Sequence, residues 1–182
     1  VGLVVVVDNG STDRTAEVAR AGGAVVVHEP RRGYGSACLA GIARAREADP
    51  AVLVILDADH SDHPEELPLL VDPVLRGEAD LVIGDRTRLA ARDALFPQQR
   101  YGNALSVRLI HLATGHRYRD MGPFRAIRMS ALERLDMEDP TWGWNVEMQM
   151  KAVQRGLRVR EVPVRYRKRV GYSKISGTVR GT

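Results

Sequence analysis

Cysteine is nearly absent from this sequence of 182 residues, because Cys38 is the only one. A single cysteine excludes an internal disulfide framework and any zinc or iron–sulfur site built from several thiolates. Aromatic residues make up 5% of the chain, which argues against a protein that stacks single-stranded bases. We therefore expect no nucleic-acid partner and a reducing compartment.

Long hydrophobic runs are also missing. The longest runs, such as Leu3 to Val7 and Val52 to Leu56, fall far short of the roughly 18 residues needed to cross a bilayer. The sequence predicts neither a transmembrane helix nor a secretory signal. Hydrophobic residues at 44% and charged residues at 27% are typical of a folded domain, and residues 1–182 are expected to form one.

Basic residues are concentrated near the end of the chain. Eight of the 27 lysines and arginines lie between Arg155 and Lys174, together with one acid, Glu161. The rest of the chain is net negative, so this segment supplies the whole positive excess. Such a cluster suits an anionic membrane surface or a phosphorylated substrate, and it equally suits a solvated strand face.

The first half of the chain repeats a short apolar run, a polar loop and a helical pattern. The apolar runs are Leu3 to Val7, Ala24 to Val27, Val52 to Leu56 and Leu81 to Gly84. Continuously apolar runs predict a parallel sheet covered on both faces, and hence an α/β fold. Ligands of such sheets bind beyond the carboxyl ends of the strands. We therefore expect Asp8, Arg32 and the loop from Asp57 to His63 to share one edge.

The pattern beyond Phe96 is less regular. Helices are predicted over Tyr101 to Thr114 and Asn145 to Arg155, and a strand over Pro123 to Arg128. Arg158 to Arg167 alternates between apolar and basic residues, which is typical of an outer strand.

Two carboxylates directly follow the Val52 to Leu56 run, in Asp57-Ala58-Asp59. Mg²⁺ and Mn²⁺ favour one or two carboxylates together with phosphate oxygens, so this pair suits a metal-bound diphosphate. Alternatively, either acid simply caps the following turn.

Two further loops offer polar groups at the same edge. Asp8 and Ser11 could accept hydrogen bonds from a nucleotide, although Ser11 or Thr12 could instead cap a helix. Gly33-Tyr34-Gly35 begins like a dinucleotide fingerprint, but its third glycine position is Cys38. That substitution disfavours a nicotinamide-dependent oxidoreductase.

Taken together, three segments resemble glycosyltransferase family 2. They are Asp8-Asn9-Gly10-Ser11-Thr12-Asp13, Arg31-Arg32-Gly33-Tyr34-Gly35 and Leu56-Asp57-Ala58-Asp59. Four downstream segments look like the dolichol-phosphate or polyprenyl-phosphate mannosyltransferase branch of that family. They are Gly84-Asp85-Arg86, Gln99-Arg100-Tyr101-Gly102-Asn103, Asp120-Met121-Gly122-Pro123-Phe124-Arg125 and Gly171-Tyr172-Ser173-Lys174.

The resemblance implies a GT-A fold, a Rossmann-like and mostly parallel sheet flanked by helices. The chain begins at what looks like the second strand of such enzymes, so the resemblance implies a domain shortened at one or both ends. His60-Ser61-Asp62-His63 departs from the family pattern after Asp59, which leaves any third metal contact open.

The resemblance also implies roles for individual residues. Asp8 would contact the base, Arg32 and Gly33 would line the nucleotide pocket, and Asp57 and Asp59 would hold the ribose and a Mg²⁺ or Mn²⁺ diphosphate. The acceptor phosphate would be clamped by Arg86, Arg100, Arg169 and Lys174.

The implied reaction is inverting transfer of a sugar from a nucleotide-sugar donor to a lipid-linked phosphate. A phosphate acceptor is ionised near pH 7 and needs no strong base, whereas a hydroxyl acceptor would need one, for which Asp120 and Glu147 are candidates. Pairing with arginines such as Arg119 or Arg125 is the alternative role for both acids.

We expect the protein in the cytoplasm, free or peripheral at the inner membrane face. The oligomeric state is left open. The competing hypothesis is a catalytically silent module that binds a nucleotide sugar or a lipid phosphate.

Overall fold

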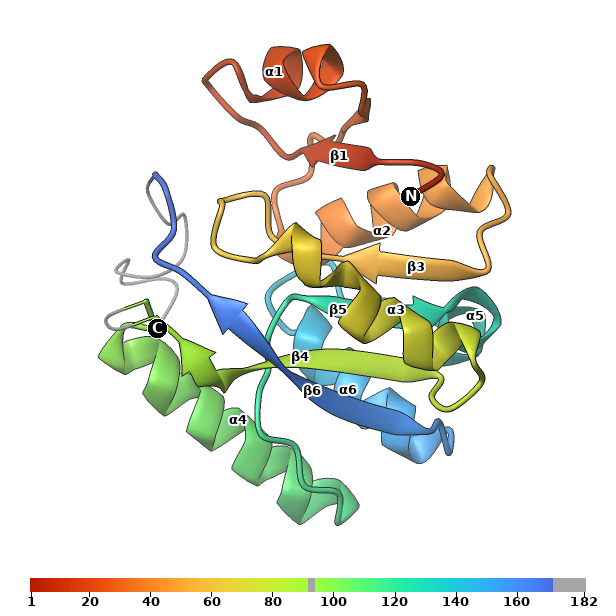
Figure 1. Cartoon of the computed structure of the whole chain (residues 1–182), viewed down its shortest axis with the longest axis vertical. Coiled ribbons are helices and arrows are strands. Elements are labelled where there is room, and N and C mark those ends of the chain that lie inside the picture. The colour runs from red at the N-terminus through yellow and green to blue at the C-terminus, as the bar shows by residue number, and fades with distance from the viewer. Residues whose placement is uncertain (92–93, 172–182) are drawn as a thin grey trace.

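The computed structural model of the protein describes residues 1–91 and 94–171 (Figure 1). Its elements, in chain order, are β1 (Val5–Asp8), α1 (Thr15–Ala21), β2 (Val25–His28), α2 (Tyr34–Arg46), β3 (Val52–Ile55), the 3-10 turn η1 (Pro64–Glu66), α3 (Leu67–Leu75), β4 (Leu81–Ala90), α4 (Pro97–Thr114), β5 (Arg125–Arg128), α5 (Met129–Leu135), α6 (Trp144–Gln154) and β6 (Val159–Tyr166). None of the helices in these two ranges combines the length and the apolar character needed to cross a membrane.

The strands form two sheets within the described residues. β1 pairs with β2 in parallel, and a four-stranded sheet has the order β3-β5-β4-β6. β4 and β6 are parallel, whereas β5 runs antiparallel to both of its neighbours. The predicted α/β class with a mostly parallel sheet is confirmed, and β5 is the exception, for which the sequence indicated no direction.

The direction of β5 follows from the path of the chain after α4. Residues 115–124 return along the sheet before β5 begins, and the Gly84 amide donates to the Phe124 carbonyl at 2.8 Å. This return brings Asp120 to the part of β4 that carries Arg86, which matters for the site below.

Both faces of the four-stranded sheet are covered, as the continuous apolar runs predict. Leu81 and Ile83 of β4 point into a core shared with α2, α4, α5 and α6, and the intervening Val82 points into a second core beneath α3. Alternate residues of one strand therefore serve two cores, which explains why the run is apolar throughout. Figure 1 shows α3 on one side of this sheet and α6 on the other.

Helix α4 has clear sequence signals at both ends. Pro97 occupies its first position, the Phe96 amide donates to Gln99 Oε1 at 2.9 Å, and Gly115 ends it with a φ of +75°. β6 is an outer strand with Val164 and Tyr166 buried and Arg165 exposed, which confirms the alternating pattern.

Candidate active site

The loop that follows β3 carries the predicted metal ligands. The Asp57 carboxylate accepts no hydrogen bond within residues 1–91 and 94–171. Burial, and after it the neighbouring Asp59 charge, raise the pKa of Asp57 to about 6. A carboxylate with a raised pKa and no hydrogen-bond donor among the described residues would be stabilised by a nearby cation.

Asp59 has partners on both oxygens. Its Oδ1 accepts from the Ser61 amide at 3.0 Å and from the Ser61 hydroxyl, and its Oδ2 accepts from Arg169 Nε at 2.8 Å and from Arg169 Nη2. Burial opposes ionisation, but the bonds from Ser61 and Arg169 outweigh it and lower the pKa of Asp59. Asp59 is therefore a charged carboxylate in a tight turn.

Asp62 is a third acid of this loop, for which the sequence indicated no specific role. Its side chain is buried, Oδ2 accepts from the Asp57 amide at 3.1 Å, and Oδ1 has no hydrogen-bond partner. Burial raises the pKa of Asp62 to about 7. The sequence shows only that an acid stands three positions after Asp59. It does not show that this acid is buried, because its burial depends on the folded loop.

The donor set of this loop fits a hard divalent cation completed by a ligand. No group of three or more His, Cys, Asp or Glu side chains in the described parts of the chain is arranged as a metal cage. Mg²⁺ and Mn²⁺ need no such cage when one or two carboxylates act with diphosphate oxygens. This fit is supported by Asp62 Oδ1, which is buried and has no hydrogen-bond partner among the described residues, and by the Asp57 carboxylate beside it.

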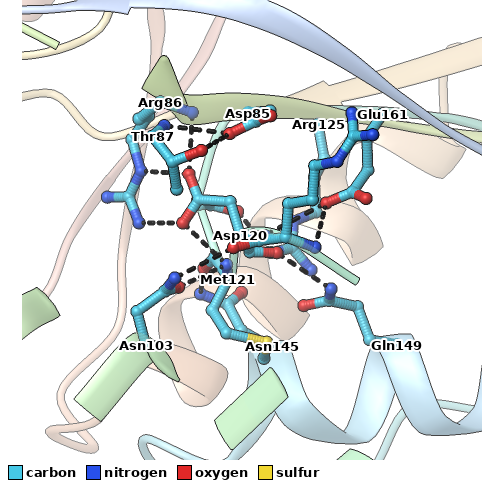
Figure 2. Close-up of polar contacts among 12 residues, drawn as sticks. Asp85, Arg86, Thr87, Asn103, Asp120, Met121, Arg125, Asn145, Gln149 and Glu161 are labelled. Carbon is cyan, nitrogen blue, oxygen red and sulfur yellow. Dashed lines mark hydrogen bonds and ion pairs between the residues drawn. The ribbon is translucent and has the colours of Figure 1, made fainter. Parts of the chain in front are cut away.

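Arg86 and Asp120 form the second part of the site (Figure 2). Arg86 Nε donates to Asp120 Oδ2 at 2.7 Å and Nη2 donates to Oδ1 at 2.8 Å, a two-pronged ion pair that is almost wholly buried. The expected partners of Asp120 were Arg119 or Arg125, and this is corrected. The return of residues 115–124 along β4 places Arg86 opposite Asp120 instead.

The Asp120 loop is held by three further side chains. Glu161 Oε1 accepts from the Arg119 and Asp120 amides, Gln149 Nε2 donates to the Asp120 carbonyl, and Asn103 Oδ1 accepts from the Met121 amide (Figure 2). Glu161 and Gln149 come from distant elements, so spacing in the sequence could not identify them. Together they fix Asp120, and through it Arg86.

Arg86 links the two parts. Burial raises the pKa of both Asp57 and Asp62, and the positive charge of Arg86 offsets part of that rise. The Arg86 guanidinium lies 4.9 Å from the centre of the Tyr166 ring. Burial opposes its charge, but Asp120 raises the pKa of Arg86, so it stays protonated. The ion pair with Asp120 therefore fixes the orientation of the Arg86 side chain beside the acidic loop.

Glu147 lies in a different environment. Its carboxylate accepts from the Glu138 and Asp139 amides at 2.9 Å each and pairs with Lys151 Nζ at 2.7 Å. Burial opposes ionisation, but Lys151 and the two amides lower the pKa of Glu147. Its expected arginine partner is corrected to Lys151, the residue one helical turn further on in α6.

The predicted nucleotide residues lie at the ends of β1 and β2. Asp8 Oδ1 accepts from the Ser11 amide at 2.8 Å, and this bond lowers the pKa of Asp8. The capping alternative for Ser11 and Thr12 is wrong, because α1 begins at Thr15 with Arg14 as its N-cap. Arg32 is exposed, and its side chain lies over Gly10.

Gly33 and Gly35 are required by a close approach of backbone. The Gly35 and Ser36 amides donate to the carbonyls of Thr141 and Pro140 at 2.9 Å each. A Cβ on Gly35 would lie 1.9 Å from the Asp139 carbonyl oxygen. The first amides of α2 are thus taken by protein carbonyls, which leaves no phosphate site of the dinucleotide type here.

The remaining clamp residues differ in exposure. Arg100 is exposed in the first turn of α4, and its Nε lies 3.4 Å from the Leu95 carbonyl oxygen. Arg169 is bound to Asp59, as described above, and Lys174 lies outside the described residues. The structure therefore brings Asp57, Asp59, Arg86, Asp120 and Arg169 into one region.

Comparison with known proteins agrees with this geometry. Residues 4–136 match the family model described as glycosyl transferase family 2. The chain belongs to this family. An uncharacterized glycosyltransferase of Mycobacterium tuberculosis is 41% identical over 97% of this chain and 79% of its own length.

Two relatives in this family carry more specific names. A dolichyl-phosphate hexose transferase of Haloferax volcanii is 35% identical over 94% of this chain and 73% of its own. An undecaprenyl-phosphate mannosyltransferase of Micrococcus luteus is 34% identical over 98% of this chain and 77% of its own.

Solved structures confirm the GT-A fold of this glycosyltransferase. Glucosyl-3-phosphoglycerate synthase of Mycobacterium tuberculosis, crystallised with Mn²⁺, uridine diphosphate and glucosyl-3-phosphoglycerate, superimposes with a TM-score of 0.71 at 24% identity. The match covers 96% of this chain and 62% of that one, so the chain spans less than two thirds of the solved structure.

Proposed function

We propose that residues 1–182 form one glycosyltransferase domain that transfers a hexose, with inversion, from a nucleotide sugar to a polyprenyl phosphate. The proposal rests on one observation: the acidic loop lies beside arginines whose side chains are held in place by ion pairs. Asp57 and Asp59 follow β3, Arg169 Nε donates to Asp59 Oδ2 at 2.8 Å, and the Arg86 charge offsets part of the rise that burial causes in the pKa of Asp57. Acids that suit a cation beside arginines that suit phosphate form a site for two phosphorylated substrates.

The donor side of the proposal places the nucleotide on the β1 and β2 ends. Asp8, Ser11, Arg32 and Gly33 would contact the nucleoside, and Asp57 and Asp59 would hold Mg²⁺ or Mn²⁺ with the diphosphate. The bound cation would stabilise the negative charge that develops on the departing diphosphate. Crystals of the synthase with Mn²⁺ and uridine diphosphate support this assignment for a protein of the same fold.

The acceptor side uses the arginines. Arg86 and Arg100, with Arg169 and Lys174, would bind the acceptor phosphate, whose oxygen attacks the anomeric carbon from the face opposite the leaving diphosphate. The new carbon–oxygen bond forms as the bond to the diphosphate breaks, and the electron pair leaves with the diphosphate. The names of the Haloferax and Micrococcus relatives support a lipid-linked phosphate as acceptor.

A phosphate nucleophile also explains why no free base is needed. Both oxygens of Asp120 bind Arg86, and both oxygens of Glu147 bind backbone amides. The lowered pKa of Glu147 makes it a weak base, and an acceptor that is ionised near pH 7 needs none.

A membrane surface is the proposed setting for such an acceptor, on its cytoplasmic side. Helix α4 presents four exposed apolar side chains along one face: Tyr101, Leu105, Leu109 and Leu112. The helix also carries Arg100 and Arg108 and no acid, which suits an anionic lipid surface.

The test is sugar transfer to a purified polyprenyl phosphate, with labelled uridine- and guanosine-diphosphate sugars and Mn²⁺. We expect transfer that Asp59→Asn reduces at least about a hundredfold. Asp72→Asn is the control, because Asp72 is an exposed acid of α3 outside the site, and it should leave transfer unchanged. Transfer that persists in full without divalent metal would overturn the proposal. Nucleotide-sugar binding without transfer to any phosphate acceptor would favour the silent binding module.

A further inference from the structure

The segment after β6 lies across the acidic loop. The Arg167 amide donates to the Ser61 carbonyl at 3.0 Å, and the Val170 amide donates to the Asp59 carbonyl at 2.9 Å. Between them, Arg169 directs its guanidinium onto Asp59 Oδ2. Residues 167–170, called the strap below, therefore hold both the backbone and the side chain of the predicted metal ligand.

Arg169 occupies the position on Asp59 that a cation would need. Asp59 Oδ1 is taken by the Ser61 amide and hydroxyl, and Oδ2 is taken by two nitrogens of Arg169. A hard cation binds a carboxylate oxygen directly, at about 2.1 Å. Two nitrogens of Arg169 already use the lone pairs of Oδ2, and the positive charge of the guanidinium repels a divalent cation, so the two compete for this oxygen.

The charges around the loop support the same conclusion. Arg86 is already paired with Asp120, and the Arg167 guanidinium contacts the His60 and Asp62 carbonyls and the His60 ring. In the described residues, Arg169 is thus the cation in direct contact with a carboxylate of this loop. It supplies the positive charge that a bound metal would otherwise bring.

The strap also limits how far Arg169 can travel. Its two backbone hydrogen bonds lie on either side of Arg169, so a guanidinium displaced from Asp59 stays at the mouth of the acidic loop. A displaced arginine in this position has a positive charge and five N–H donors with no carboxylate partner. Such a group suits an incoming phosphate.

We propose that Arg169 is an exchangeable occupant of the metal site: it binds Asp59 until a divalent cation takes that carboxylate, and only then does it turn to the acceptor phosphate. This exchange rests on the proposed function, because it uses the metal role of Asp59. The exchange imposes an order of binding, in which the donor and the metal bind before Arg169 binds the acceptor phosphate. It also protects Asp59 from being an unpaired charge in the free protein.

The test measures Mn²⁺ binding to the free protein by electron paramagnetic resonance, with no nucleotide or acceptor present. Arg169→Met should bind Mn²⁺ about tenfold more tightly than the wild type, because the competing charge is gone. Arg165→Met is the matched control. Arg165 lies in β6, four residues before Arg169, and pairs with Glu65 and Glu66, so its loss removes one charge without freeing Asp59 and should change the affinity little.

A second readout follows the strap itself. The Val170 amide should exchange its hydrogen faster in Arg169→Met than in Arg165→Met, because the side-chain anchor is lost. Equal Mn²⁺ affinities of Arg169→Met and the wild type, or no binding by either protein, would overturn the exchange.

Asp59→Asn separates this proposal from the proposed function. If Asp59→Asn abolishes Mn²⁺ binding while Arg169→Met leaves it unchanged, the metal site stands and the exchange is wrong. If Asp59→Asn leaves Mn²⁺ binding intact, both in the wild type and in Arg169→Met, the metal role of Asp59 is wrong, and the exchange is wrong with it.

Discussion

Two acids, the half-buried Asp57 and the buried Asp62, set the electrostatic character of the site at the level of single residues. An aspartate in the unfolded chain has a pKa near 3.8, whereas burial raises these two to about 6 and about 7. Between about pH 4 and 7 the folded protein therefore binds more protons than the unfolded chain. The free energy of unfolding contributed by these groups falls as pH rises through this window.

Asp62→Asn tests this linkage. Asparagine keeps an oxygen for the Asp57 amide but cannot ionise, so the variant should lose less stability between pH 4 and 7. We compare the free energy of unfolding of the variant with that of the wild type at each pH. At pH 7.5 this difference should favour the variant by about 1 to 3 kcal/mol more than it does at pH 4. Urea unfolding across pH measures this, with Asp72→Asn as the control that keeps the wild-type slope. An unchanged slope in Asp62→Asn would contradict the assignment.

Glu147 provides a second prediction for a single residue. Glu147→Gln loses the ion pair with Lys151 and one of the two amide bonds, so unfolding should cost about 1 to 2 kcal/mol less. Transfer to a phosphate acceptor should change less than about threefold, whereas loss of a general base would cost about a hundredfold. Glu133→Gln, at an exposed acid of α5, is the control for both measurements.

The predictable part of the site is the part that is local in sequence. Asp57 and Asp59 could be found because a buried strand and two acids stand side by side in the chain. Glu161 and Gln149 could not be found, because they reach Asp120 from β6 and α6 across 41 and 29 positions. Likewise, the pairing of Arg169 with Asp59 spans 110 positions, and only the folded strap brings the two together.

At the level of elements, the junction of α2 with residues 139–141 is the most constrained contact. Glu147 holds the Glu138 and Asp139 amides, and the carbonyls of Pro140 and Thr141 then accept from the start of α2. No side chain fits between these backbones at Gly35. The junction joins the loop after β2 to α6.

Gly35→Ala tests this junction directly. The added methyl group would overlap the Asp139 carbonyl, so we expect a loss of more than about 3 kcal/mol of unfolding free energy, or no folding. Gly102→Ala is the matched control, because Gly102 lies in α4 with nothing within 4 Å of a new Cβ. It should leave stability unchanged or raise it by up to about 1 kcal/mol. Equal effects of the two changes would contradict the close approach.

Elements differ in how far the sequence could predict them. The first three strands were evident because each is a continuous apolar run in the sequence. The extension of β4 to Ala90 was missed, because its second half is polar and partly exposed and pairs with β6 only after a register shift. Helix α5 was missed as well, since seven residues leave room for less than two full periods of a helical pattern.

At the scale of the whole molecule, apolar and basic groups gather on α4 and the strap. Figure 1 shows the start of α4 close to the end of β4, and Arg100 belongs to the first turn of α4. The exposed apolar face of α4 extends from that end along the helix. A protein resting on this face would present its acceptor side to the lipid.

Vesicle binding tests this orientation. We expect the protein to co-sediment with vesicles of anionic phospholipid, less with neutral vesicles, and less at high salt because surface charge is screened. Replacing Leu105 and Leu112 together by Asp removes two exposed apolar contacts of α4 and adds two negative charges, so binding should fall at least about tenfold. Leu75→Asp is the matched control, because Leu75 is an exposed leucine of α3, and it should bind as the wild type does. Equal losses of vesicle binding in the two variants would place the lipid contact elsewhere. Transfer to a water-soluble short-chain polyprenyl phosphate should persist in every variant, since the proposed reaction takes place at the strand ends.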